Sequence, residues 1–229
     1  MRVPTGADDA LAQAAQAAAQ TVELAFELGG EAGQEGALRS LPGDHRAALA
    51  QALQGQLPWL AQEPGVGVHA LRAPLGEGGR VLLPRRVRLL LRLPERRLDD
   101  ARELCGRRLV VAGQPLRVGA CAAPRALQAT RTLHAEFVCW DAPVAAFEAR
   151  CAAALGELGI DSPWMSGGER EALGPDGADV LRGRALLLHD LPHRHALALQ
   201  VLGLGGHRLL GCGLFKPHKA ITGLGSEDD

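Results

Sequence analysis

The chain has 229 residues, enough for one large domain or for two of about 100 residues each with their own hydrophobic cores. Its 47% of hydrophobic and 22% of charged residues are typical of a soluble globular protein and disfavour a disordered tail, a collagen or a coiled coil. Four Phe, three Trp and no Tyr leave few residues for an aromatic nucleic-acid platform and none for chemistry at a tyrosine hydroxyl.

Charge is distributed unevenly along the chain. The formal net charge is −1, yet residues 80–131 contain 13 Arg against four acidic residues. The middle of the chain is therefore basic and the remainder is acidic.

The cysteines and the apolar stretches predict a cytoplasmic protein. Five widely spaced cysteines without a C-x-x-C pair are typical of a reduced compartment. We predict no signal peptide and no membrane span, because the apolar stretches are far shorter than the roughly 20 residues that cross a bilayer.

The first half of the chain predicts the order strand, helix, strand, strand, helix, strand. Residues 22–28 alternate and end at Gly29-Gly30, and Asp44 is expected to cap a helix whose leucines recur at four-residue spacing. The predicted elements are a strand at 22–28, a helix at 45–57, a strand at 66–71, a turn at 76–79, a strand at 87–93, a helix at 94–105 and a strand at 109–118, kinked at Gly113.

The second half predicts the same order again, after an irregular link over 120–130. Its elements are a strand at 133–140, a helix at 143–158, a short strand at 160–164, a glycine-rich turn, a strand at 180–188, a helix at 192–202 and a strand at 209–216. Two βαββαβ units predict an α+β protein of tandem ferredoxin-like modules, each a four-stranded antiparallel sheet backed by two helices. We expect the modules to span 1–120 and 121–229.

A glycine-rich segment connects the last predicted helix to the last predicted strand. Residues 203–213 fit the spacing G-x-G-x-x-x-x-x-G-x-G. Glycines allow positive φ and close approach of another chain, and successive amides in such a loop can hold phosphates. The segment fits neither a P-loop nor a dinucleotide fingerprint, so a phosphate-binding loop and a simple tight turn are the two interpretations.

A family resemblance favours the phosphate-binding loop over the simple turn. This glycine pattern, in the second ferredoxin-like unit, resembles the C-terminal signature of the CRISPR-associated endoribonucleases of the RAMP superfamily, which process precursor CRISPR RNA. The string GLGGHRLLGCGLFKPHK, with SLPGDHRAALAQAL upstream, is most similar to the Myxan-subtype branch. The resemblance extends over about residues 21–221 and makes both predicted modules RRM- or RAMP-like.

The resemblance implies a metal-independent reaction without a cofactor. The 2′-hydroxyl before the scissile phosphate attacks in line, leaving a 2′,3′-cyclic phosphate and a 5′-hydroxyl. Such a reaction needs a base near the 2′-oxygen, an acid near the leaving 5′-oxygen and cationic donors on the phosphate.

His45 is the candidate catalytic residue. In the resembled family a catalytic His commonly lies at the start of the first helix of the first module, the place that Asp44-His45 occupies. The positive end of the helix dipole there favours the neutral ring that accepts a proton. Its catalytic partner stays open among Ser40, Arg46 and Arg208, because the chain has no Tyr and no Lys before Lys216.

Arginines and the glycine-rich loop are the candidate RNA-binding groups. We expect the densest positive patch to combine a strand edge and the helix after it, with acidic residues pairing with some of it. The patch comprises Arg85, Arg86 and Arg88 on the strand edge and Arg92, Arg96, Arg97 and Arg102 on the helix, and the acidic residues are Asp99, Asp100 and Glu103. His189 and His193 are expected to share a helix face, but no third ligand accompanies them and no metal site is predicted. The predicted RNA-binding residues are Arg85, Arg86, Arg88, Arg182, Arg184, Arg194, Gly203, Gly205, Gly206, His207, Arg208, Gly211, Gly213 and Lys216.

The predicted function is cleavage of precursor CRISPR RNA at its repeat, with the product passed to subunits of a CRISPR surveillance complex. The alternative is a non-catalytic RAMP subunit that only binds guide RNA in such a complex. A two-histidine cyclic phosphodiesterase is excluded, because none of the eight histidines lies in an H-x-[ST] tripeptide.

Overall fold

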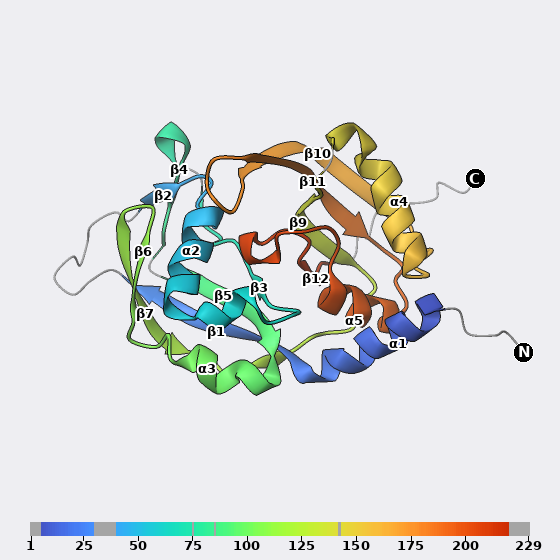
Figure 1. Cartoon of the computed structure of the whole chain (residues 1–229), viewed down its shortest axis with the longest axis horizontal. Coiled ribbons are helices and arrows are strands. Elements are labelled where there is room, and N and C mark those ends of the chain that lie inside the picture. Colours follow the sequence, from blue (N-terminus) through green and yellow to red (C-terminus); the bar gives the residue numbers. More distant parts are fainter. Residues whose placement is uncertain (1–5, 30–39, 75, 85, 142, 220–229) are drawn as a thin grey trace, which may run out of the picture.

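The computed structural model describes residues 6–29, 40–74, 76–84, 86–141 and 143–219. Two β-sheets with their helices lie beside each other (Figure 1). The first sheet has the order β3-β5-β1-β7-β6, with β8 also pairing with β1. Its elements are β1 (Thr21–Gly29), α2 (Arg46–Gln56), β3 (Gly67–Val68), β5 (Arg88–Pro94), α3 (Leu98–Arg102), β6 (Arg108–Val111), β7 (Gln114–Cys121) and β8 (Arg125–Ala126).

The second sheet has the order β10-β11-β9-β12. Its elements are β9 (Leu133–Cys139), α4 (Phe147–Glu157), β10 (Trp164–Leu173), β11 (Val180–Leu188), α5 (His193–Leu202) and β12 (Phe215–Pro217). In both sheets the first strand of the βαββαβ unit lies between the third and the fourth. The predicted α+β fold of tandem ferredoxin-like modules is confirmed.

Alternation of residue types explains how the first sheet buries one face. Leu24, Phe26 and Leu28 of β1 are buried in the core together with Leu89 and Leu91 of β5. Successive side chains of a strand point to opposite faces, so the residues between these leucines lie on the other face. That face carries the polar side chains that matter below.

The N-terminal helix packs with the second module. Helix α1 (Gly6–Ala17) lies beside α5 (Figure 1), and its Leu11 and Ala14 join the core formed by β9, β11, α4 and α5. The division of the chain at 120/121 stays a prediction. No helix among the described residues is long and apolar enough to cross a membrane.

Several predicted elements were wrong in detail. The single strand at 109–118 is a hairpin of β6 and β7, because Ala112 and Gly113 both adopt positive φ and turn the chain. The predicted glycine-rich turn after 164 is the long strand β10, which crosses Gly167 and Gly168 with a change of register against β11. Much of the predicted strand at 209–216 is a 3-10 turn, η6 (Arg208–Leu210), followed by the short β12.

A third buried cluster joins the two modules. Ala47 and Ala50 of α2 pack with Phe137 and Cys139 of β9, and the cluster is completed by residues of the β10–β11 hairpin and of the glycine-rich loop: Ala172, Leu181, Leu210 and Cys212. Helix α2 therefore lies between its own sheet and the second module. Two small strands, β2 (Ser40–Pro42) and β4 (Arg80–Leu82), pair beside it.

Candidate functional site

A cavity of about 630 Å³ lies between the two modules. We call it the inter-module cleft. One wall is the polar face of the first sheet, and the opposite wall includes residues of α5 and β12. The cleft is lined by Glu23, Ala25, His69, Ala70, Arg72, Pro84, Arg86, Val87, Arg88, Leu90, Arg125, Ala126, Leu127, Gln128, Gln200, Lys216 and Pro217.

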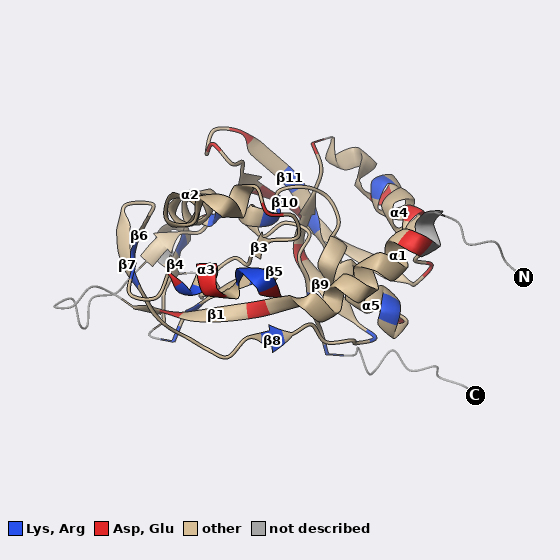
Figure 2. Ribbon diagram, turned by 60° about the horizontal axis from the view of Figure 1, so that its bottom comes forward, with Lys and Arg blue, Asp and Glu red and all other residues tan. Residues whose placement is uncertain are grey.

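Cations dominate this lining. Arg86, Arg88 and Arg125 lie along the first module, and Arg125 is in β8, whose basic residue is blue at the lower edge of Figure 2. Within the described part of the chain, Arg86 and Arg125 have no carboxylate partner, whereas Arg88 lies 3.3 Å from exposed Glu27. A groove lined with cations concentrates a polyanion near its walls.

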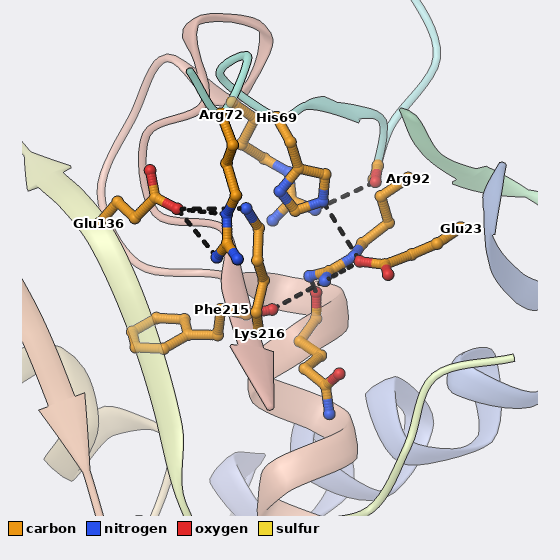
Figure 3. Close-up of polar contacts among 10 residues, drawn as sticks. Glu23, His69, Arg72, Arg92, Glu136, Phe215 and Lys216 are labelled. Carbon is orange, nitrogen blue, oxygen red and sulfur yellow. Dashed lines mark hydrogen bonds and ion pairs between the residues drawn. The ribbon is translucent and has the colours of Figure 1, made fainter. Parts of the chain in front are cut away.

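A buried arginine lies behind Glu23, which lines the cleft. Arg92 of β5 is 0% exposed, and its guanidinium donates to the carbonyl oxygens of Gln200 at 2.7 Å and Phe215 at 2.7 Å, both in the second module. It also donates to the Glu23 carboxylate at 2.6 Å. Figure 3 shows these side chains meeting where β5, α5 and β12 converge. Arg92 therefore joins the two modules.

Glu23 also faces a buried histidine. The Nε2 of His69 lies 3.2 Å from the Glu23 carboxylate (Figure 3). Burial raises the pKa of Glu23, but His69 and the positive charge of Arg92 outweigh it and bring the value to about 2. Burial lowers the pKa of His69 to about 4, although Glu23 acts in the opposite direction. The network is therefore a carboxylate with one buried cation and a neutral imidazole near pH 7.

A second carboxylate holds cations on the other side of the cleft. Glu136 of β9 accepts hydrogen bonds from Arg72 at 3.1 Å and from the Lys216 ammonium at 3.4 Å. Burial lowers the pKa of Lys216, although the charge of Glu136 acts against it. Lys216, which was predicted to bind RNA, therefore lines the cleft. Its side chain is mostly buried and its ammonium already pairs with Glu136.

His45 is buried at the start of α2. The residue is 4% exposed. Its Nδ1 lies 3.2 Å from the Pro42 carbonyl oxygen, and its Nε2 accepts a hydrogen bond from the Leu71 amide at 3.2 Å. These contacts fix a neutral ring with its proton on Nδ1. Burial lowers the pKa of His45, as does the charge of Arg46, despite the Pro42 carbonyl. In this conformation no ring nitrogen is available to a substrate.

The expected N-cap at Asp44 was wrong. His45 occupies the N-cap position of α2, and the Asp44 carboxylate accepts the amide of Arg46 at 3.4 Å. The same carboxylate accepts the amide of Leu173 in β10. Asp44 therefore attaches the β10–β11 hairpin to the start of α2.

The glycine-rich loop, residues 203–213, is tightly packed against its surroundings. A Cβ at Gly205 would lie 2.2 Å from the Cys139 carbonyl oxygen, and one at Gly213 would lie 2.0 Å from that of Leu204. Both residues also adopt positive φ, as do Gly203 and Gly211. Most of these glycines thus satisfy a packing requirement. Gly206 differs, because a Cβ there would meet nothing within 4 Å.

Arg208 of this loop binds protein carbonyls. Its guanidinium donates to the carbonyl oxygens of Gly65 at 3.0 Å, Val66 at 3.2 Å and Leu202 at 2.7 Å. Burial, together with the charge of Arg92, lowers its pKa to about 10. Arg208 therefore attaches the glycine-rich loop to the first module, and these three carbonyls occupy the donors that we predicted would contact RNA.

The other predicted RNA-binding residues are divided over the surface. Arg85 lies outside the described residues, while Arg86 and Arg88 line the cleft. Arg182 pairs with Glu171 at 3.1 Å within the β10–β11 hairpin, and Arg184 lies 3.8 Å from Glu148. Arg194 is exposed on α5. None of these last three lines the cleft.

The expected positive patch on the segment after β5 was wrong. Arg96 and Arg97 both pair with the buried carboxylate of Glu63, and Arg102 pairs with Asp99 at 2.7 Å. Carboxylates thus neutralise this face. His189 and His193 do not share a helix face either, because α5 begins at His193. Within the described ranges, no group of three or more His, Cys, Asp or Glu could hold a metal ion.

Comparison with known proteins identifies the family. Residues 22–220 match the family model described as Cas6 Crispr. The chain belongs to the Cas6 family. It is 34% identical over 179 residues to the CRISPR-associated endonuclease Cas6 of Myxococcus xanthus (strain DK1622), a match that covers 77% of this chain and 76% of that protein. The resemblance seen in the sequence is confirmed.

Solved structures agree on the fold. A CRISPR-associated Cas6 protein superposes with a TM-score of 0.59 at 10% identity, covering 87% of this chain and all of that one. A RAMP protein described as binding different RNA substrates superposes with a TM-score of 0.57 at 11% identity, and the match covers 85% of this chain and 98% of that one. A Cas6-related protein from Pyrococcus furiosus superposes with a TM-score of 0.53 at 11% identity, and the match covers 86% of this chain and 98% of that one.

Sequence reasoning missed several residues of the inter-module cleft. Arg72 and Arg125 line the cleft, and Glu23 and His69 form its base. The sequence of β5 could have shown that Arg88 and Arg92 share one face of the sheet. The two arginines are four positions apart and alternate with the buried Leu89 and Leu91, so they point to the opposite face from these leucines. That pattern places both on the cleft side, but it does not show that Arg92 is covered by the second module.

Proposed function

We propose that this Cas6 protein is an endoribonuclease that binds the repeat of precursor CRISPR RNA and cuts it without a metal ion. The 2′-hydroxyl attacks the adjacent phosphate, leaving a 2′,3′-cyclic phosphate on one product and a 5′-hydroxyl on the other. The observation that carries the proposal is the 34% identity to an endonuclease of this family over three quarters of both chains.

The inter-module cleft supports RNA as the ligand. Its cations come from both modules, which Arg92 and Arg208 join through hydrogen bonds. Because phosphate contacts position an RNA without reading its sequence, we assign Arg86, Arg88 and Arg125 to the phosphates of a single strand. The few aromatic residues of the chain agree with binding through charge more than through base stacking.

We keep His45 as the proposed base, with one structural condition. Its Nε2 must exchange the Leu71 amide for the ribose hydroxyl, so the segment around Leu71 must move from the ring when RNA binds. The neutral tautomer already present is the form that accepts a proton. His45 therefore needs a change of partner but no change of protonation.

The reaction is tested with the repeat RNA of the protein's own locus in excess EDTA, followed by analysis of the product ends. We expect cleavage, with a cyclic phosphate on the upstream fragment and a 5′-hydroxyl on the downstream fragment. A 3′-hydroxyl product, or cleavage that EDTA abolishes, would contradict the proposed mechanism.

The cleft is tested by binding measurements at several salt concentrations. Arg88→Ala and Arg125→Ala should each weaken binding and reduce the slope of log K against log[salt] by about 0.7, the contribution of one contact with a single strand. Arg102→Ala is the matched control, because Arg102 is paired with Asp99 and lies outside the cleft. Equal salt slopes for all three variants would rule out this path for the RNA.

A non-catalytic guide-RNA carrier is the second candidate function. The observation that favours it is His45, whose ring is buried with both nitrogens engaged. The two functions differ in one result. A carrier binds repeat RNA and leaves it intact under every condition, whereas the enzyme cuts it once per binding event or more.

A further inference from the structure

A second cavity, of about 440 Å³, is lined in part by the glycine-rich loop. We call it the loop pocket. Helix α2 contributes Ala50 and Gln54, and the segment before β3 contributes residues 60, 61 and 63–66. Pro175, between β10 and β11, and residues 205–210 of the glycine-rich loop complete the lining. Its volume lies in the range of pockets that hold molecules of nucleotide size. Gly206 opens onto free space, so the loop backbone there is accessible.

His207 lines this pocket and is held by a carboxylate. Its Nε2 lies 3.0 Å from the Asp141 carboxylate, its side chain is 19% exposed, and no contact of Nδ1 is found among the described residues. The residue adopts φ 60°, a left-handed conformation that is uncommon for a side chain other than Gly, Asn or Asp. A carboxylate at one ring nitrogen fixes which nitrogen faces outward.

The other described histidines lack this combination. His45 is buried, with both ring nitrogens in contact with backbone groups. His69, whose Nε2 lies 3.2 Å from Glu23, lines the inter-module cleft and not the loop pocket. His189 makes a similar contact, with Nδ1 2.9 Å from Asp190, but it lines neither the cleft nor the loop pocket. His207 alone, within the described ranges, joins an oriented ring to a cavity formed by the glycine-rich loop.

We propose that His207 is the general acid of the RNA-cleavage reaction and that the loop pocket holds the nucleotide whose 5′-oxygen leaves. This inference rests on the proposed function. In the protonated ring, Nε2–H donates to Asp141 and Nδ1–H donates to the leaving oxygen. As the O2′–P bond forms and the P–O5′ bond breaks, the 2′-proton passes to the base and the Nδ1 proton passes to O5′. The ring then takes a proton from water for the next turnover.

The decisive substrate replaces the leaving 5′-oxygen with sulfur. A thiolate leaves without receiving a proton, so a variant that lacks only the acid recovers on this substrate. We choose His207→Asn, because Asn tolerates the left-handed conformation and can still contact Asp141. The variant should cleave the oxygen substrate about 100-fold or more slowly, the size of a general-acid contribution. On the sulfur substrate it should cleave close to the wild-type rate.

Two controls separate catalysis from folding. His207→Asn should still bind repeat RNA carrying a 2′-deoxy nucleotide at the cleavage site, and should melt near the temperature of the wild type. His189→Asn removes the other carboxylate-held histidine and should cleave both substrates normally. Asp141→Asn should slow the oxygen substrate in the same selective way, to a smaller extent.

The outcomes are distinguishable. If the wild type leaves the oxygen substrate intact, the proposed function is contradicted and this inference falls with it. If the wild type cleaves but His207→Asn cleaves equally well, only the role of His207 is overturned. If His207→Asn is equally slow on oxygen and sulfur substrates, the ring positions the RNA and is not the acid.

Discussion

Arg92→Met should destabilise the protein strongly, because it removes the charged group that joins the two modules. The substitution deletes three hydrogen bonds at 2.6 to 2.7 Å and leaves the Glu23 carboxylate beside a neutral His69. Removing one partner of a buried ion pair costs about 3–5 kcal/mol. Glu23 is 20% exposed and so keeps some contact with water, which places the expected loss near 3 kcal/mol.

The assay is urea unfolding followed by tryptophan fluorescence, with a parallel thermal melt. For a protein of this size a loss of about 3 kcal/mol corresponds to a fall in Tm of about 6–12 °C. Arg88→Met is the matched control on the same strand, because its pair with Glu27 is exposed and worth about 0–1 kcal/mol. Arg92→Lys keeps the charge but cannot reach both carbonyls, so its stability should fall between these variants.

One result would refute this reasoning. If Arg92→Met and Arg88→Met unfold at the same urea concentration, the buried guanidinium contributes no more than a surface charge. The modules would then be held by their other contacts, which include the apolar cluster around α2 and the hydrogen bonds of Arg208.

Three further predictions concern the packing of the loop and two histidines. Gly205→Ala should lower the free energy of unfolding by about 3 kcal/mol or more, because the residue has a positive φ and its Cβ would clash with the Cys139 carbonyl. Gly206→Ala, whose Cβ meets nothing, should change that free energy by less than about 1 kcal/mol. Urea unfolding measures both. His69 has its pKa lowered from 6.5 to about 4, so the unfolded state binds the proton more readily. Stability should be complete above pH 6.5 and fall by up to about 3 kcal/mol as the pH drops to 4. Unfolding of His69→Gln at each pH should show a flatter dependence, and an unchanged slope would contradict the assignment. His45→Ala should abolish cleavage, preserve RNA affinity and cost about 1–3 kcal/mol, because the buried Leu71 amide loses its acceptor; retained cleavage would remove His45 from the mechanism.

Local patterns determined the elements that have one buried face. The alternation of β1 and the four-residue spacing of leucines in α2 reflect burial against a single neighbour, and both elements were predicted within a residue or two. The order of these elements predicted the tandem ferredoxin-like fold. The glycine spacing predicted the family. Positive φ and close packing at these positions allow only glycine, so the pattern can be read from the sequence without knowing the contacts of other residues.

Contacts between the modules decided what the charged and titratable residues do. In the sequence Arg88, Arg92 and Arg96 look equivalent, yet one lines the cleft, one is buried between modules and one pairs with Glu63. His45 at a helix start gives no sign that Leu71 covers it. The reason is physical: the polarity pattern of a strand or helix records which face meets its own sheet, whereas the second module covers residues by contacts that join positions more than 100 residues apart.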